Sequence, residues 1–162
     1  MQKIYVDTAA WIALINTRDA LHTLAWQVFD NLQKRVVSLY RVDKVIGDEV
    51  STLYGYTTQK RKTQLVTTEF ILLEVADALS SPPLRAKAVT FINRLRQHSL
   101  LEILPASAQL LADGWVLYCQ RPDKEWSLTD CISFSVMTQQ QIMDAFTSDH
   151  HFEQAGFRIL LK

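Results

Sequence analysis

Short apolar runs alternate along the chain with longer segments in which apolar residues recur every three or four positions. The short runs predict buried strands, at 3–6 (KIYV), 65–66 (LV), 101–104 (LEIL), 142–146 and 158–161 (RILL). The longer segments predict helices with one buried face, at 8–15, 22–34, 67–79, 84–97, 107–119 and 130–139. Because strands that alternate with helices form parallel sheets covered on both faces, we predict an α/β protein. Its expected architecture is a three-layer α/β/α sandwich with a central, mainly parallel sheet of four to five strands.

One stretch, from Arg41 to Lys62, does not fit this alternation. It holds short apolar pieces around Gly47 and Gly55, and a further strand is indicated just before it, at 36–40. The predicted sheet and its helices are complete without the stretch. We therefore predict an inserted hairpin or loop near residues 41–62, within a single domain that spans residues 1–162.

Composition narrows the class of protein. The chain has 162 residues, of which 48% are hydrophobic and 21% charged, as is usual for a globular protein with a substantial core. No apolar run reaches the roughly 18 residues that a membrane span needs, and the first residues lack the pattern of a signal peptide. The two cysteines, Cys119 and Cys131, form neither a disulfide framework nor a zinc motif. These features predict a reduced, cytoplasmic location and no membrane partner.

Four acidic residues stand beside apolar sequence at positions that a parallel sheet would bring together. Asp7 follows the first strand, Glu74 lies in the helix after the second strand, Asp130 opens a late helix and Asp149 follows a late strand. Open α/β sheets bind ligands at the carboxyl ends of their strands, and carboxylates are ligands that Mg²⁺ prefers. The alternative is structural: Asp7 and Asp130 as helix caps, Asp149 as a turn residue and Glu74 as an exposed helix position.

Four segments resemble one family. They are VDTAAWIALIN, TTEFILLEVADAL, SLTDCISFSVM and AFTSDHHFEQAGF, and together they are similar to the PIN domain, in particular to the bacterial VapC-like ribonucleases. The resemblance covers the whole chain apart from roughly residues 41–62. It implies a parallel-sheet α/β/α fold, an acidic site for Mg²⁺ or Mn²⁺, and endonuclease activity on single-stranded RNA.

The resemblance also implies roles and partners. By position, Asp7, Glu74, Asp130 and Asp149 would be both the catalytic and the metal-binding residues, while Asp144 is close in sequence without a clear role. In bacteria, such a protein is the toxin of a toxin–antitoxin pair, so a small antitoxin protein and a homodimer are expected. The apolar early helices are candidates for the dimer surface. The formal net charge is zero, so attraction for RNA has to come from a local patch or from bound metal.

Other interpretations stay open at this point. His150 and His151 are interpreted as solvated turn residues rather than ligands, and Cys131 as a buried thiol rather than a nucleophile. Trp11, Trp26 and Trp115 are interpreted as core or interface residues, and Trp126 is the better candidate among the tryptophans to face substrate. Several basic residues could contact phosphates, although a solvated surface is the better interpretation: Lys60, Arg61, Lys62, Arg85, Lys87, Arg94 and Arg96. The alternative functions are a non-catalytic PIN module that binds RNA or a protein partner, and a phosphate-accepting aspartate domain.

Overall fold

A five-stranded parallel sheet forms the centre of the protein. The computed structural model describes the backbone of residues 2–33, 35–46, 49–60 and 63–162, and the side chains of residues 2–32 and 63–162. The sheet has the order β5-β4-β1-β6-β7, and every pair of neighbouring strands is parallel. The strands are β1 (Gln2–Val6), β4 (Thr63–Thr68), β5 (Leu101–Leu104), β6 (Asp144–Phe146) and β7 (Arg158–Ile159). The prediction of a mainly parallel sheet with four to five strands is confirmed.

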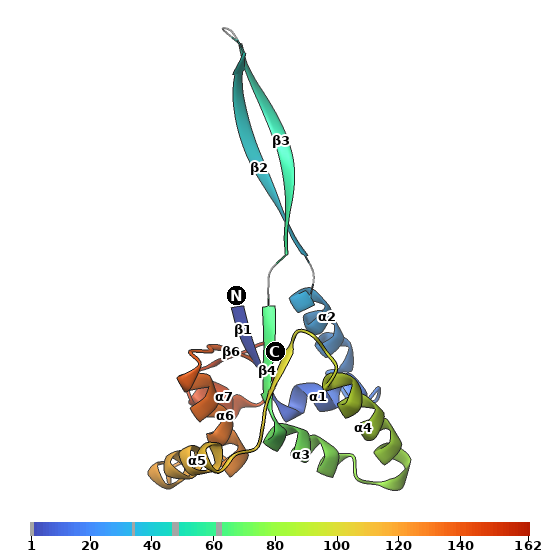
Figure 1. The fold of residues 1–162 in the computed structure, drawn as a ribbon, viewed down its shortest axis with the longest axis vertical. Helices are drawn as coiled ribbons and strands as arrows, with labels where there is room; N and C mark the ends of the chain where they lie inside the picture. Colours follow the sequence, from blue (N-terminus) through green and yellow to red (C-terminus); the bar gives the residue numbers. More distant parts are fainter. Residues whose placement is uncertain (1, 34, 47–48, 61–62) are drawn as a thin grey trace.

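Helices cover both faces of this sheet. One group packs together on one side, and a second group packs together on the other, so that the predicted three-layer α/β/α sandwich is confirmed (Figure 1). The first group consists of α1 (Thr8–Ile15), α2 (His22–Gln33), α3 (Glu69–Ala78) and α4 (Pro82–Leu95). The second consists of α5 (Ala108–Gln120), α6 (Leu128–Gln139) and α7 (His150–Gln154).

Side-chain caps fix where most of these helices begin. Asp7, Thr68, Ser107, Ser127 and Asp149 each accept a hydrogen bond from a backbone N–H of the helix that follows, which satisfies one of the donors that a helix leaves unpaired. Helix α4 begins at Pro82, two residues before the predicted start, with proline at its first position. Proline is favoured there because its missing N–H would have no partner within the helix.

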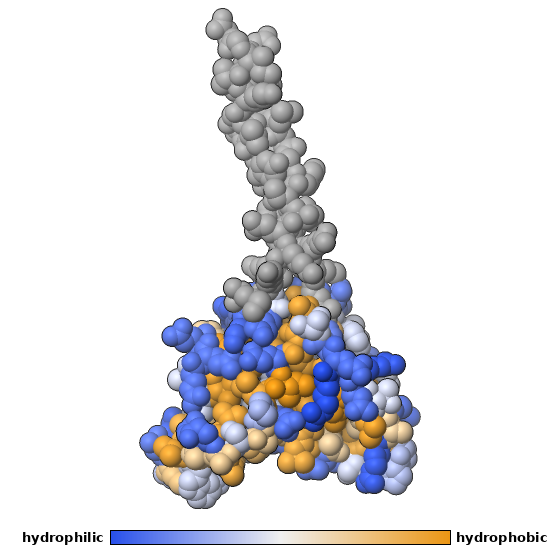
Figure 2. Space-filling view, in the orientation of Figure 1, coloured by the Kyte–Doolittle hydropathy of each residue, from blue (hydrophilic) through white to orange (hydrophobic). Residues whose placement is uncertain are grey.

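The buried core joins the central strands to both helical layers. Ile4, Tyr5, Val6, Val66 and Phe146 are each no more than 1% exposed. In the second layer, α5 lies very close to α6, and a Cβ atom added at Gly114 would stand 2.3 Å from Ile132 Cγ1. Figure 2 shows hydrophobic residues across the middle of the visible face of the body, where Figure 1 places β4 and β5. Strand β5 lies at the edge of the sheet, and its residues are only partly buried.

The insertion is a long hairpin. Strands β2 (Arg35–Ile46) and β3 (Glu49–Lys60) pair antiparallel from Arg35↔Lys60 to Ile46↔Glu49 and form a sheet of their own. Figure 1 shows the hairpin extending away from the five-stranded sheet. The prediction of an inserted hairpin is confirmed, but its predicted start at Arg41 is wrong, because the strand indicated at 36–40 is part of β2. The basic group Lys60–Lys62 and the acids of the insertion lie outside the described side chains.

Two further observations concern the described part of the chain. None of its helices has the length and apolar character that a membrane crossing requires. Both cysteines are free thiols, with Cys119 exposed and Cys131 buried. The prediction that Cys131 is a buried thiol is confirmed.

Candidate metal centre at the carboxyl ends of the strands

The three central strands end at the same edge of the sheet. Strand β1 lies between β4 and β6, and all three run in the same direction. From β1 the chain crosses to β4 on one side, and later strands fill the other side, which makes this edge a topological switch point of the kind where α/β proteins bind ligands. Asp7 follows β1 and Asp149 follows β6, while Glu74 comes from α3 and Asp130 from α6.

Asp7 is a buried carboxylate, and no lysine or arginine among the described side chains forms an ion pair with it. It is 6% exposed, and its Oδ2 atom accepts hydrogen bonds from Thr147 Oγ1 at 2.8 Å and from the Ala9 backbone N at 3.4 Å. The pKa of Asp7 is raised to about 6, chiefly by burial and also by the negative charge of Asp130, against the lowering effect of the hydrogen bonds. The protein therefore holds this group where ionisation is unfavourable.

Asp130 is fixed by the start of α6. The predicted helix start at Asp130 is wrong, because the helix begins at Leu128 and Ser127 is its cap. Asp130 Oδ2 accepts from the Ser127 N at 2.8 Å, and Ser127 Oγ accepts from the Asp130 N at 3.0 Å. This reciprocal capping box leaves the carboxylate at the sheet edge. Burial raises the pKa of Asp130, and the charge of Asp149 raises it too, while His151 lowers it.

Hydroxyl groups hold the other two acids. Thr8 Oγ1 donates to Glu74 Oε2 at 2.7 Å, which joins α3 to the residue after Asp7. The fully buried Thr147 donates to Asp7, and its Oγ1 also accepts from the Asp149 N at 3.0 Å. Thr147 thus connects two of the acids through one atom. Its importance was missed in the sequence, where only a hydroxyl residue placed between a strand and Asp149 pointed to it.

The structure places the four predicted acids near the carboxyl ends of the central strands. Thr147 links Asp7 with Asp149, the pair Thr8–Glu74 adjoins Asp7, and the charge of Asp130 acts on Asp7. No lysine or arginine among the described side chains forms an ion pair with any of the four. Carboxylates grouped in this way repel each other unless a cation joins them. An all-oxygen set of this kind fits Mg²⁺ or Mn²⁺, and the role of these residues as ligands stays a prediction.

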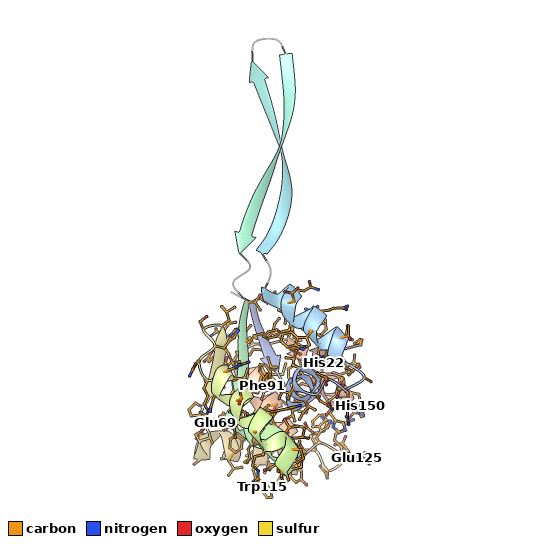
Figure 3. All side chains as sticks on the ribbon, turned by 90° about the vertical axis from the view of Figure 1, so that its right-hand side faces the viewer. His22, Glu69, Phe91, Trp115, Glu125 and His150 are labelled. Carbon is orange, nitrogen blue, oxygen red and sulfur yellow. The ribbon has the colours of Figure 1, made fainter. Side chains whose placement is uncertain are left out.

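His151 also belongs to this group. Its Nδ1 atom lies 3.4 Å from Asp130 Oδ2 and 3.5 Å from Asp149 Oδ1, and its side chain is 18% exposed. The interpretation of His151 as a solvated turn residue is wrong, because α7 packs against α6 and encloses the ring. His150 does fit that interpretation: its side chain is 70% exposed, and Figure 3 shows it at the outer margin of the body.

Two other predicted candidates lie elsewhere. Asp144 stands at the amino end of β6, opposite Ile4, where it pairs with Arg158 and accepts from Gln2 Nε2 at 2.9 Å. It is therefore at the end of the strand away from the four acids. The expectation that Trp126 faces substrate is wrong, because its ring is 5% exposed and packs edge-on against Phe134 at a centroid distance of 5.0 Å.

Comparison with known proteins gives this arrangement a family context. No protein-family model matches the chain. A curated protein from Mycobacterium tuberculosis, 23S rRNA-specific endonuclease VapC20, is 25% identical over 154 residues, which is 95% of each chain. The crystal structure of M. tuberculosis VapC20, described as a Sarcin-Ricin loop cleaving toxin, matches with a TM-score of 0.71 at 23% identity over 96% of both chains. This chain is thus similar to VapC20 in sequence and in fold.

Other solved structures share the fold of this VapC-like chain. VapBC2 from Rickettsia felis, bound to a DNA fragment from its promoter, matches with a TM-score of 0.62 at 11% identity over 98% of this chain and 97% of that one. FitAcB from Neisseria gonorrhoeae matches with a TM-score of 0.54 at 15% identity over 96% and 95%. The resemblance to VapC-like PIN domains predicted from the four sequence segments is confirmed.

Proposed function

We propose that this VapC-like chain is a metal-dependent endoribonuclease that cleaves phosphodiester bonds of single-stranded RNA. The observation that carries the proposal is the meeting of Asp7, Glu74, Asp130 and Asp149 at one sheet edge without a lysine or arginine partner among the described side chains. The relative named as a 23S rRNA-specific endonuclease supports RNA as the substrate class. We infer that all four acids hold Mg²⁺ or Mn²⁺.

The chain's own contribution to such a reaction is a set of acids oriented in advance. A divalent ion, when bound, offsets the negative charge of the acids and the phosphodiester and lowers the pKa of a water molecule that it holds. Thr147 fixes Asp7, Thr8 fixes Glu74, and the capping box fixes Asp130. Carboxylates that are already oriented need little rearrangement when substrate binds, which is how preorganised sites lower a barrier.

Replacing Asp130 with Asn tests the proposal. The amide can still accept from the Ser127 N, so α6 keeps its cap, while a charge and a ligand are lost. We expect Asp130→Asn to melt at least as high as the parent without metal, to gain little from added Mn²⁺, and to lose cleavage of a labelled single-stranded RNA. A ligand present at 100 times its dissociation constant raises the parent's stability by about 2.7 kcal/mol.

Asp123→Asn is the matched control, since Asp123 is an exposed acid that pairs with Arg121 in the loop before α6. It should cleave RNA and respond to Mn²⁺ as the parent does. Asp130 would be only a structural cap if Asp130→Asn cleaved as fast as the parent. A parent protein that binds RNA and never cleaves it would favour the non-catalytic PIN module.

Partners complete the proposal. The VapBC2 and FitAcB structures support an antitoxin partner. We infer that this partner is a small protein that covers the acidic edge. A homodimer stays a prediction. Four of the eight residues of α1 are buried and the other four are partly buried. In contrast, α5 carries an exposed apolar stripe of Leu111, Trp115 and Tyr118, with the Trp115 and Tyr118 rings stacked at 5.7 Å. Such a stripe is a surface that another protein would cover.

A further inference from the structure

The imidazole of His151 is directed at two of the four acids. Its Nδ1 atom lies 3.4 Å from Asp130 Oδ2 and 3.5 Å from Asp149 Oδ1. The same Nδ1 is buried and makes no hydrogen bond. A carboxylate oxygen can only accept, so in the neutral imidazole with its proton on Nε2 the Nδ1 lone pair faces two further lone pairs. A buried polar atom without a partner costs about 1–3 kcal/mol, which indicates that the arrangement serves a group that all three atoms bind.

The spacing of these atoms matches that of ligands around one ion. Ligands about 2.1 Å from a metal lie about 3.0 Å apart at octahedral angles and about 3.4 Å apart at tetrahedral angles. The two distances from Nδ1, 3.4 and 3.5 Å, lie at and just above the upper end of that range. The donor atoms of Asp149, His150 and His151 also lie within 4.8 Å of one another. One ion could therefore contact Nδ1 and both carboxylates with small side-chain movements.

The surrounding residues hold His151 in this place. The His151 backbone N donates to Asp149 Oδ1 at 2.9 Å. The residue that caps α7 therefore also fixes the backbone of His151. The following residue, Phe152, is fully buried and packs edge-on against Phe134 of α6 at 4.9 Å. This contact ties α7 to the helix that carries Asp130. His150, in contrast, has no such support and is mostly exposed.

We propose that His151 is a nitrogen ligand of the metal centre and makes the centre prefer a first-row transition ion such as Mn²⁺ over Mg²⁺. The inference rests on the proposed function, because it requires a metal at the four acids. A set of carboxylates suits Mg²⁺ and Mn²⁺ alike, whereas imidazole binds transition ions and Mg²⁺ demands oxygen ligands. One imidazole in an otherwise all-oxygen set therefore selects among divalent ions.

Pulsed electron paramagnetic resonance of the Mn²⁺-loaded protein tests the ligand directly. We expect modulation from a coordinated imidazole nitrogen in the parent and in His150→Ala, and its loss in His151→Ala. Labelling the histidines of His150→Ala with ¹⁵N should change the modulation frequency, which identifies a histidine without altering His151. Modulation that survives in His151→Ala, or that disappears only in His150→Ala, overturns the assignment.

Metal-dependent melting tests the selectivity. We expect His151→Asp, which restores an all-oxygen set, to reduce the ratio of Mn²⁺ to Mg²⁺ affinity by about tenfold or more, since even residues that only support ligands change affinity 10–100-fold. An unchanged ratio overturns the inference while the metal centre stands. If neither ion raises the melting temperature of the parent, the proposed metal centre fails, and the inference fails with it.

Discussion

Two aspartates on neighbouring strands have the same burial and opposite surroundings. Asp7 and Asp144 are each 6% exposed. Asp7 lies at the carboxyl end of β1, and Asp144 at the amino end of β6, which pairs with β1. Asp144 has the Arg158 guanidinium and the Gln2 amide as donors. Asp7 has a hydroxyl, a backbone N–H and the repulsive charge of a second carboxylate.

The difference teaches which buried acids deserve a functional interpretation. A buried charge is tolerated when a paired charge and hydrogen bonds compensate it. Asp144 meets that condition within the protein, so its burial is explained by structure alone. Asp7 has no lysine or arginine partner among the described side chains, so its charge is relieved by protonation or, under the proposed function, by a bound cation. The comparison therefore depends on the surrounding charge rather than on the depth of burial.

The largest expected effect is on RNA cleavage, in which variants of Asp7 and Asp144 should differ. Asp7→Asn should lower RNA cleavage by more than about 100-fold, because even residues that only orient metal ligands change activity 10–100-fold. Asp144→Asn should keep most of the parent's rate. Single-turnover cleavage of a labelled RNA at saturating Mn²⁺ measures both. Equal losses in the two variants would break the comparison, since both acids would then act at one site.

The next effect concerns stability without metal, where the two substitutions should have opposite signs. The pKa of Asp7 is raised from 3.8 to about 6 by burial, which corresponds to about 3 kcal/mol of unfavourable ionisation. Between these pH values the folded state binds more protons than the unfolded state, so metal-free stability should fall as pH rises from about 4 to 6. Above about pH 6 this contribution should be constant.

Asp7→Asn should remove this pH dependence and raise the metal-free melting temperature above pH 6. Asp144→Asn should lower the metal-free stability by about 1–2 kcal/mol, since it weakens hydrogen bonds to a charged group. Thermal melts in chelator at several pH values, from about 4 to 8, measure both. A metal-free Asp7→Asn protein that is less stable than the parent at pH 8 would mean that Asp7 is a structural residue like Asp144.

The smallest expected effect concerns Thr147, whose hydroxyl group holds the Asp7 carboxylate. Thr147→Val removes the hydroxyl that joins Asp7 to the Asp149 backbone, so it should cost about 1–2 kcal/mol and about tenfold in cleavage. Thr147→Ser keeps the hydroxyl and should recover most of the cleavage. If Thr147→Val and Thr147→Ser lose the same amount of cleavage, the hydroxyl does not position the acids, and the loss reflects changed packing.

Much of this architecture could be predicted because it is encoded locally. Runs such as KIYV and LEIL are short and apolar, and capping residues mark most helix starts, so the order of the elements and the edge that carries Asp7 and Asp149 followed from the sequence. The predicted start of the hairpin was wrong because the apolar residues at 36–40 suit a core strand as well as a hairpin strand. Local sequence does not distinguish the two.

The parts of the candidate centre that the sequence did not predict depend on tertiary packing. Nothing adjacent to His151 shows that Phe152 will pack on Phe134 and turn the imidazole toward Asp130. The prediction for Trp126 was wrong for the same reason. The burial of Trp126 depends on α6 and on Gln154, which accepts a hydrogen bond from its Nε1 at 3.2 Å. The roles of Thr147 and His151 follow from contacts with partners 140 and 21 positions away in the sequence.

The pairing of β1 with β6 has a consequence for how the protein is made. Asp7 leaves the ribosome 140 residues before its partner Thr147. Contacts between such distant residues form late, because the intervening chain has to be ordered first. A nascent chain of about 140 residues holds Asp7, Glu74 and Asp130 but lacks Thr147, Asp149 and His151. Synthesis itself therefore keeps the acidic edge incomplete until Thr147, Asp149 and His151 have been made.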